Sequence, residues 1–177
     1  YSLAYALSAL GGGTPIANSV FIGQSSGLNA TGSNSSFFIG YLAGALATNA
    51  NYSNFFGQSA GYDASLSSGS NFFGLDAGKS AGTSNGSNFF GNEAGKNSNN
   101  SFSSNFFGTR AGADSPYSDN SNFFGASAGD TVTATSSNFF GSGAGAYATN
   151  ADHSNFFGYL AGLYATNASH SIFLGTN

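Results

Sequence analysis

Hydrophobic and polar positions recur along this chain with a period of seventeen residues. Each unit reads approximately S-N-F-F-G-x-x-A-G, followed by eight looser residues rich in Ala, Ser, Thr and Asn. The spacing between the first glycines of successive units is seventeen except once, between Gly125 and Gly141, where it is sixteen. Self-similarity at a fixed period is typical of repeat folds. The marking glycines are Gly23, Gly40, Gly57, Gly74, Gly91, Gly108, Gly125, Gly141, Gly158 and Gly175.

The unit is too short for a pair of helices, because helical repeats run to more than about thirty residues. Its Gly, Ser, Asn and aromatic content also disfavours helix. Short strands joined by glycine turns fit better, and seventeen extended residues trace roughly 56 Å, enough for one closed turn of two or three strands. The sequence therefore predicts an all-β fold, a single-chain β-solenoid (β-helix) of about ten to eleven 17-residue rungs.

The repeat predicts one domain that covers residues 1–177. Residues 1–17 form a degenerate N-terminal rung, because Ser2 and Ala9 fall in the serine and alanine columns and Ala6 takes the place of the glycine. Residues 18–177 carry the regular repeats. Terminal repeats commonly differ from the interior ones because they face a different environment.

Equivalent residues of neighbouring rungs should stack directly on one another. A column of phenylalanine rings, each pair contributing about 0.5–1.5 kcal/mol beyond area burial, is expected to run the length of the body. An asparagine column is suited to an amide ladder. The phenylalanine ladder consists of Phe21, Phe38, Phe55, Phe72, Phe89, Phe106, Phe123, Phe139, Phe156 and Phe173. The asparagine column consists of Asn54, Asn71, Asn88, Asn105, Asn122, Asn138 and Asn155.

The second phenylalanine of each unit raises the question of direction, because successive strand residues point to opposite faces. We expect the serine and the first phenylalanine to point inward and the second phenylalanine outward. The alternative is a bend at the glycine that turns both rings inward. An outward stripe would be large enough to require a partner, most simply another copy of the chain. This predicted lateral interface consists of Phe56, Phe73, Phe90, Phe107, Phe124, Phe140 and Phe157.

The two ends of a solenoid expose strand edges, which invite pairing. We expect one copy's last strand to pair with another's first, a head-to-tail contact that gives open filaments when it does not close. The alternative is that the chain is a fragment of a longer repeat protein. The predicted end-to-end interface consists of Ser2, Leu3, Ala4, Tyr5 and Ala6 with Ser171, Ile172, Phe173, Leu174 and Gly175.

Charge and composition exclude several classes of function. Only 6% of residues are charged, the net charge is −4, and Lys79, Lys96 and Arg110 are the only basic residues apart from histidine. Three cations make no basic patch, so we expect no nucleic-acid partner and no docking to anionic lipid. A membrane-spanning helix needs about 18 consecutive apolar residues, and no apolar run in this sequence is close to that length, so no membrane insertion is expected. The absence of cysteine excludes disulfides.

No arrangement of side chains suggests catalysis, so we expect no enzyme, no cofactor and no metal. His153 and His170 are one rung apart, which makes a metal pair conceivable, but a solvated pair is the simpler interpretation. Asp76, Glu93 and Arg110 share a column, and Glu93 and Arg110 are expected to form a surface ion pair worth at most about 1 kcal/mol.

The columns resemble the N-x-x-x-G-x-x-A-G repeats of bacterial and phage surface fibres and adhesins. They are distantly similar to the head repeats of trimeric autotransporter adhesins, with S-V-A-I-G-type units best matched by 19–23 and 171–175. The double phenylalanine departs from those relatives, which usually carry one bulky and one small residue. The resemblance implies an extracellular or cell-surface β-solenoid for attachment or fibre building.

Three functions are compatible with the predicted solenoid. The first is a structural protein, the subunit of an extracellular filament or fibre that assembles head to tail, with other copies of itself as partner. The second is an adhesin or phage tail-fibre shaft that binds a surface or glycan ligand, which the sequence does not identify. The third is ice binding, for which Thr48, Thr149 and Thr166 share a column, although no T-x-T ladder exists.

Overall fold

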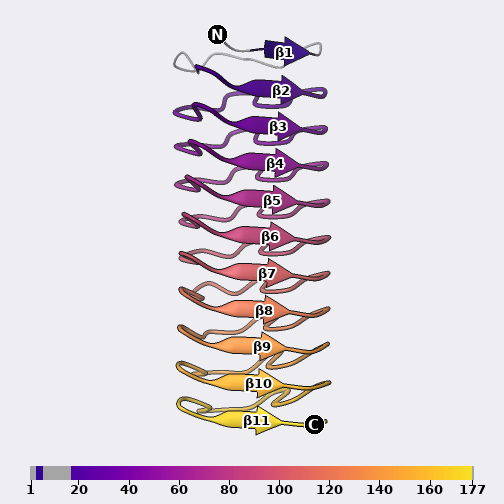
Figure 1. The fold of residues 1–177 in the computed structure, drawn as a ribbon, viewed down its shortest axis with the longest axis vertical. Coiled ribbons are helices and arrows are strands. Elements are labelled where there is room, and N and C mark those ends of the chain that lie inside the picture. The colour runs from indigo at the N-terminus through magenta and orange to yellow at the C-terminus, as the bar shows by residue number, and fades with distance from the viewer. Residues whose placement is uncertain (1–2, 6–16, 177) are drawn as a thin grey trace.

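The chain coils into a stack of closed turns with one strand in each turn (Figure 1), as a computed structural model of the protein shows. The structure describes residues 3–5 and 17–176. Eleven parallel strands form one sheet in sequence order, and the described residues contain no helix. This confirms the predicted all-β solenoid. The strands are β1 (Leu3–Tyr5), β2 (Val20–Ile22), β3 (Phe37–Ile39), β4 (Asn54–Phe56), β5 (Asn71–Phe73), β6 (Asn88–Phe90), β7 (Asn105–Phe107), β8 (Asn122–Phe124), β9 (Asn138–Phe140), β10 (Asn155–Phe157) and β11 (Ile172–Leu174).

Neighbouring strands pair in a register of one repeat, so that like residues lie opposite like residues. In β6 and β7, for example, Phe89 is paired with Phe106. The register extends to the first strand, where Ala4 is paired with Phe21, so a strand of the degenerate N-terminal rung is present. Ser2 and Ala6 of the predicted end-to-end interface lie outside the described residues.

The expectation of two or three strands in each turn is wrong: each described rung has one strand of three residues, followed by a chain of turns. In the rung after β4, the amide of Ala60 donates to the carbonyl of Gly57, and that of Tyr62 donates to Ser59. Ser59 and Gly61, the third residues of these turns, have φ of 55° and 63°. Left-handed residues at alternate positions prevent an extended strand. Isolated bridges outside the strands join Thr31 to Thr48, Thr48 to Ser65 and Tyr117 to Thr133.

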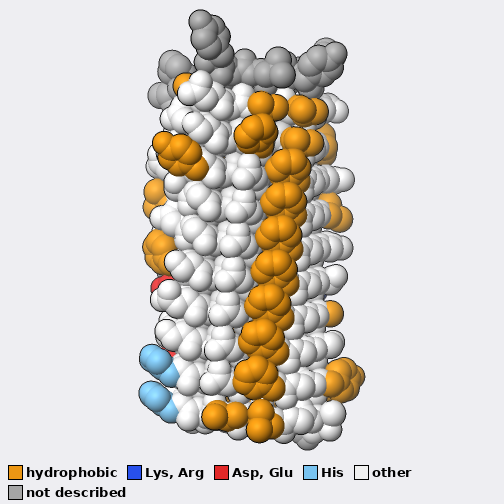
Figure 2. All heavy atoms as spheres, viewed as in Figure 1, with side chains coloured by type: hydrophobic (Ala, Val, Ile, Leu, Met, Phe, Trp, Pro, Cys, Tyr) orange, Lys and Arg blue, Asp and Glu red, His pale blue; other side chains and the backbone are white. Residues whose placement is uncertain are grey.

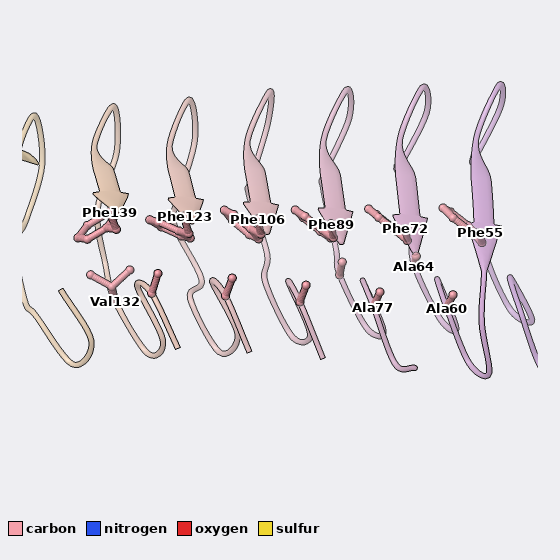
Figure 3. Close-up of a cluster of buried hydrophobic side chains, with 14 of the residues drawn as sticks. Phe55, Ala60, Ala64, Phe72, Ala77, Phe89, Phe106, Phe123, Val132 and Phe139 are labelled. Atoms are coloured by element: carbon pink, nitrogen blue, oxygen red, sulfur yellow. The ribbon is translucent and has the colours of Figure 1, made fainter. Parts of the chain in front are cut away.

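The core is one aromatic ring thick. Inward phenylalanines from Phe21 to Phe156 are completely buried, and Phe72 and Phe89 stack with their centroids 4.7 Å apart. Figure 3 shows these rings extending from the strands toward small side chains on the opposite wall, among them Ala60, Ala77 and Val132. Small residues on that wall leave enough volume for one phenylalanine ring in each rung, so the predicted phenylalanine ladder fits inside the turns.

The two glycines of the unit are needed for different reasons. A Cβ on Gly74 would lie 2.3 Å from the carbonyl oxygen of Gly91 in the next rung. A Cβ on Gly78 would lie 2.3 Å from Cδ2 of the Phe72 ring. The first glycine therefore permits close approach of successive rungs, and the second gives the core ring its space.

The inward serine column connects both walls of a rung and also connects successive rungs. The hydroxyl of Ser53 donates to the carbonyl of Ser67 across the rung at 2.6 Å, and it accepts the amide of Ser70 from the next rung at 3.2 Å. Ser53 and Ser70 are fully buried. The hydroxyl thus satisfies two buried backbone groups that the turn geometry leaves without a strand partner.

The one shortened rung deviates on the wall opposite the sheet. There the bridge from Tyr117 to Thr133 continues the stack. The inner rings of Phe123 and Phe139 meet edge to face at 63°, whereas the outer rings of Phe124 and Phe140 remain parallel at 1°. The missing residue therefore disturbs the core but leaves the outer surface of the sheet regular.

Three buried hydroxyls across the core, those of Ser84, Ser101 and Ser118, have no hydrogen-bond partner. The equivalent residues of other rungs include Ala50 and Ala134, which are also buried. Because a buried unsatisfied polar group costs about 1–3 kcal/mol, Ser101→Ala is expected to raise the free energy of unfolding by about 1 kcal/mol, measured by urea denaturation.

The matched control for that substitution is Ser104→Ala. The hydroxyl of Ser104 donates to the carbonyl of Ser118 and accepts the amide of Ser121. Its removal leaves both groups unpaired and is expected to lower the free energy of unfolding by about 1–3 kcal/mol. Equal destabilisation by Ser101→Ala and Ser104→Ala would contradict this assignment of the two serine columns.

Candidate functional site: the exposed face of the sheet

The second phenylalanine of each unit points outward, as expected, and the alternative with both rings inward is wrong. We call Phe56, Phe73, Phe90, Phe107, Phe124, Phe140 and Phe157 the outer phenylalanine column. Its members are half-buried or exposed, while the preceding phenylalanines are fully buried. Figure 2 shows them as an unbroken row along the molecule, over the sheet, with further hydrophobic side chains in line with it at both ends.

The outer rings stack face to face on one another. Phe73 and Phe90 stack with centroids 4.8 Å apart and planes 3° from parallel, and Phe90 and Phe107 repeat this geometry. Because each ring covers the face of its neighbour, the column presents ring edges to its surroundings. Ring edges carry the positive part of the aromatic quadrupole, so this surface is suited to edge contacts rather than to face-on stacking of a ligand.

The predicted asparagine ladder lies beside this column, two residues earlier in each strand. The amide nitrogen of Asn88 donates to Oδ1 of Asn105 at 2.9 Å, and Asn105 donates in the same way to Asn122. The series is continuous from Asn54 to Asn155. Each amide keeps one N–H and one lone pair beyond those in the ladder, so the ladder retains hydrogen-bonding capacity toward the outside.

The exposed face of the sheet carries no charge. We define the sheet face as the first and third residues of β2 to β11 and the residue after the marking glycine, such as Gln58 or Asn92. None of these positions from Val20 to Thr176 holds Asp, Glu, Lys, Arg or His. All the charged residues of the chain lie elsewhere on the rungs, so the face combines aromatic edges and neutral amides.

The charges gather instead in an ion network on the turns, centred on Arg110. The predicted pair forms, with Nη1 of Arg110 3.0 Å from Oε2 of Glu93. Arg110 also contacts Asp130 at 2.9 Å and Asp114 at 3.3 Å, and Lys96 contacts Glu93 at 3.0 Å. Only the Glu93–Arg110 pair follows from the columns of the repeat, because Asp114 and Asp130 belong to other columns than Arg110: Asp114 lies in the same rung and Asp130 in the next.

The network perturbs two ionisable groups. The hydrogen bond from Lys96, helped by Arg110, lowers the pKa of Glu93 below its ordinary value despite partial desolvation. The hydrogen bonds to Asp130 raise the pKa of Arg110 above its ordinary value. Because all three Lys and Arg residues belong to contacts of this kind, they are occupied by carboxylates of the same chain.

Glu93 should therefore stabilise the fold in a pH-dependent manner. Its folded-state pKa is lowered, so its contribution is complete above the unfolded value of about 4.5 and is lost as pH falls through the folded value. We expect wild type to be more stable than Glu93→Gln at neutral pH, with the difference vanishing in acid. Urea unfolding from pH 7 to pH 2 measures this; a difference independent of pH would contradict it.

The two histidines stack, with the rings of His153 and His170 5.1 Å apart. Tyr147 and Tyr164 form a second exposed pair at 5.2 Å. Among residues 3–5 and 17–176 there is no group of three His, Cys, Asp or Glu side chains placed to hold a metal ion. These pairs thus show the same rung-on-rung stacking as the rest of the surface.

The last strand presents the described part of the predicted end-to-end interface. Ile172 and Leu174 are 69% and 76% exposed, whereas Phe173 stacks on Phe156 at 4.7 Å. The amide of Ser171 donates to the hydroxyl of Ser154, as in the other rungs. β11 pairs with β10 on one side, in the same register as every other strand.

Comparison of the chain with models of known protein families, with curated proteins and with solved structures gave no match. No helix with the length and apolar character of a membrane span occurs in the part of the chain that the structure describes.

Proposed function

We propose that this chain is a structural protein, the subunit of an extracellular filament or fibre that grows head to tail by continuing the β-solenoid. The proposal depends on one observation, the identical pairing of every rung with the next. A structure whose interior interfaces are all the same can add a further rung in the same geometry. Growth of this kind is heterologous and does not close on itself.

The direction of the backbone donors supports this mode of growth. The first residue of an interior strand donates its N–H to the serine carbonyl of the following rung: Asn138 donates to Ser154, and Asn155 donates to Ser171. The equivalent donor of the last strand is Ile172 N–H, which by the same geometry is directed away from β10. An exposed strand edge with its donors in line is a template for another strand.

The other end of the stack offers a strand of the same length. β1 pairs with β2 through Leu3, Ala4 and Tyr5, in register with Val20, Phe21 and Ile22. A second copy placed beyond β11 would bring its β1 onto β11 with Ala4 opposite Phe173. The core column of one copy would then lead into that of the next, and the outer columns of both copies would be in line.

The test is electron microscopy of the purified chain, with substitutions in β11. Wild type is expected to form fibres many times the length of one chain, with a repeat of about 4.8 Å along the axis in fibre diffraction. Ile172→Pro removes the forward-directed donor and should abolish the long fibres.

Ile172→Asn is the matched control, because it keeps the N–H and places in β11 the residue that Asn155 provides in β10. Fibres should persist with this variant. Isolated rods of one chain's length from wild type at high concentration would refute head-to-tail growth and favour the alternative of an adhesin or tail-fibre shaft. Fibres that form equally well with Ile172→Pro would also refute it.

A further inference from the structure

We propose that the sheet face is an interface through which two copies of this protein pair side by side, with the outer phenylalanine column and the asparagine ladder of each copy facing those of the other. This lateral contact is separate from the head-to-tail contact. It would convert a single row of rungs into a paired fibre, and it can form whether or not the copies also join at their ends.

The distribution of charge favours this face over the turns that carry the charged side chains. Each copy carries a net charge of −4, so two copies repel one another on average. Asp63, Asp119, Asp152 and the ion network lie on the turns, and the sheet face holds no Asp, Glu, Lys, Arg or His. Contact through the sheet face therefore buries no charge and keeps the carboxylates of the two copies at the outside of the pair.

The periodicity identifies the partner as a second copy. The outer rings from Phe56 to Phe140 repeat at 4.8 to 4.9 Å, as in the pairs Phe56–Phe73 and Phe107–Phe124, and the last pair, Phe140–Phe157, is 5.3 Å apart. Another copy has the same repeat by construction, so a favourable contact at one rung recurs at all of them. A mineral, an ice surface or a polysaccharide would match this spacing only by coincidence.

The two columns of the face can contact each other across a pair of copies. Figure 2 shows the phenylalanine column as a continuous row, and the asparagine side chains, two residues earlier in each strand, are shorter than the rings. The phenylalanine column of one copy can lie over the asparagine ladder of the other, where the free N–H and lone pair of each amide meet ring edges or the opposing ladder. Stacked aromatics and amide ladders between facing sheets are the elements of dry sheet-to-sheet interfaces.

The available area is sufficient for a stable pair. β2 to β11 span roughly 48 Å at about 4.8 Å a strand, and five residues of each rung span about 16 Å. The product is on the order of 750 Å² per copy, close to the about 800 Å² per partner of stable protein interfaces. The undisturbed outer rings at the shortened rung, 1° from parallel between Phe124 and Phe140, keep this area continuous.

The test places charge on the sheet face and measures mass and fibre width. Wild type at tens of micromolar is expected to sediment at multiples of two chains, and its fibres should be two solenoids wide. Phe90→Lys with Phe107→Lys should give single-width particles, because each copy would then bury two unpaired cations. Circular dichroism checks that the sheet is retained.

A matched control replaces another exposed aromatic stack, Tyr147 and Tyr164, by lysine, and should leave the pairing unchanged. If the phenylalanine variant does not fold, Gln58→Lys with Asn92→Lys charges the same face at exposed positions whose residue type varies among rungs. These should also give single-width particles.

The readouts separate this contact from head-to-tail growth. Lysine variants of the sheet face that still form long fibres, but only one solenoid wide, support the lateral interface. If the protein forms only short rods, loss of pairing between the rods of these variants supports it equally. Wild type that is single-width at all concentrations, or pairing unaffected by lysine on the sheet face, overturns it. Wild-type protein that does not pair but is retained on crystalline cellulose or on ice would also overturn it, in favour of those surfaces.

Discussion

The stack depends on the serine hydroxyl that points into the core of every regular rung. From Ser19 to Ser154 it closes a rung by donating to a carbonyl on the far wall, and it accepts the amide of the equivalent serine one rung later, as Ser53 does with Ser67 and Ser70. A threonine at this position would need space for an additional methyl group in the buried interior. An alanine would lose both hydrogen bonds. Because the same hydroxyl takes part in both closure and stacking, it holds each rung in register with the next, in the sixteen-residue rung after Ser121 as well as in the others, and the phenylalanine, asparagine and glycine columns follow from that register.

That register gives the molecule two aromatic columns with different roles. The inner column fills a core only one ring thick and tolerates disorder in its stacking, as the 63° contact of Phe123 with Phe139 shows. The outer column is more regular than the inner one, although it is less buried. A solvent-exposed row of parallel rings contributes little to closing the rungs. Its regularity is more readily understood as a property of an interface, which is the basis of the lateral pairing proposed above.

Charge is arranged in a way that serves both proposed contacts. Each of the three cations contacts a carboxylate of the same chain: Lys79 contacts Asp76, and Lys96 and Arg110 both contact Glu93. The remaining negative charge is on the turns, which leaves the sheet face and the strand edge of β11 neutral at Ile172, Phe173 and Leu174. In the proposed contacts, uncharged surfaces would allow close approach of identical molecules, and the charged turns would lie outside the contact.

The repeat alone predicts the solenoid, its register and the two phenylalanine columns, because a strict repeat forces like residues to lie over like and strand alternation separates Phe89 from Phe90. The amide ladder and the Glu93–Arg110 pair were predictable for the same reason. The tertiary structure decided what depends on the path of the backbone between strands. Left-handed residues such as Ser59 replace further strands by turns. The approach of Gly78 to the Phe72 ring, and the contacts of Asp114 and Asp130 with Arg110, join positions from different columns, which a one-dimensional repeat does not align.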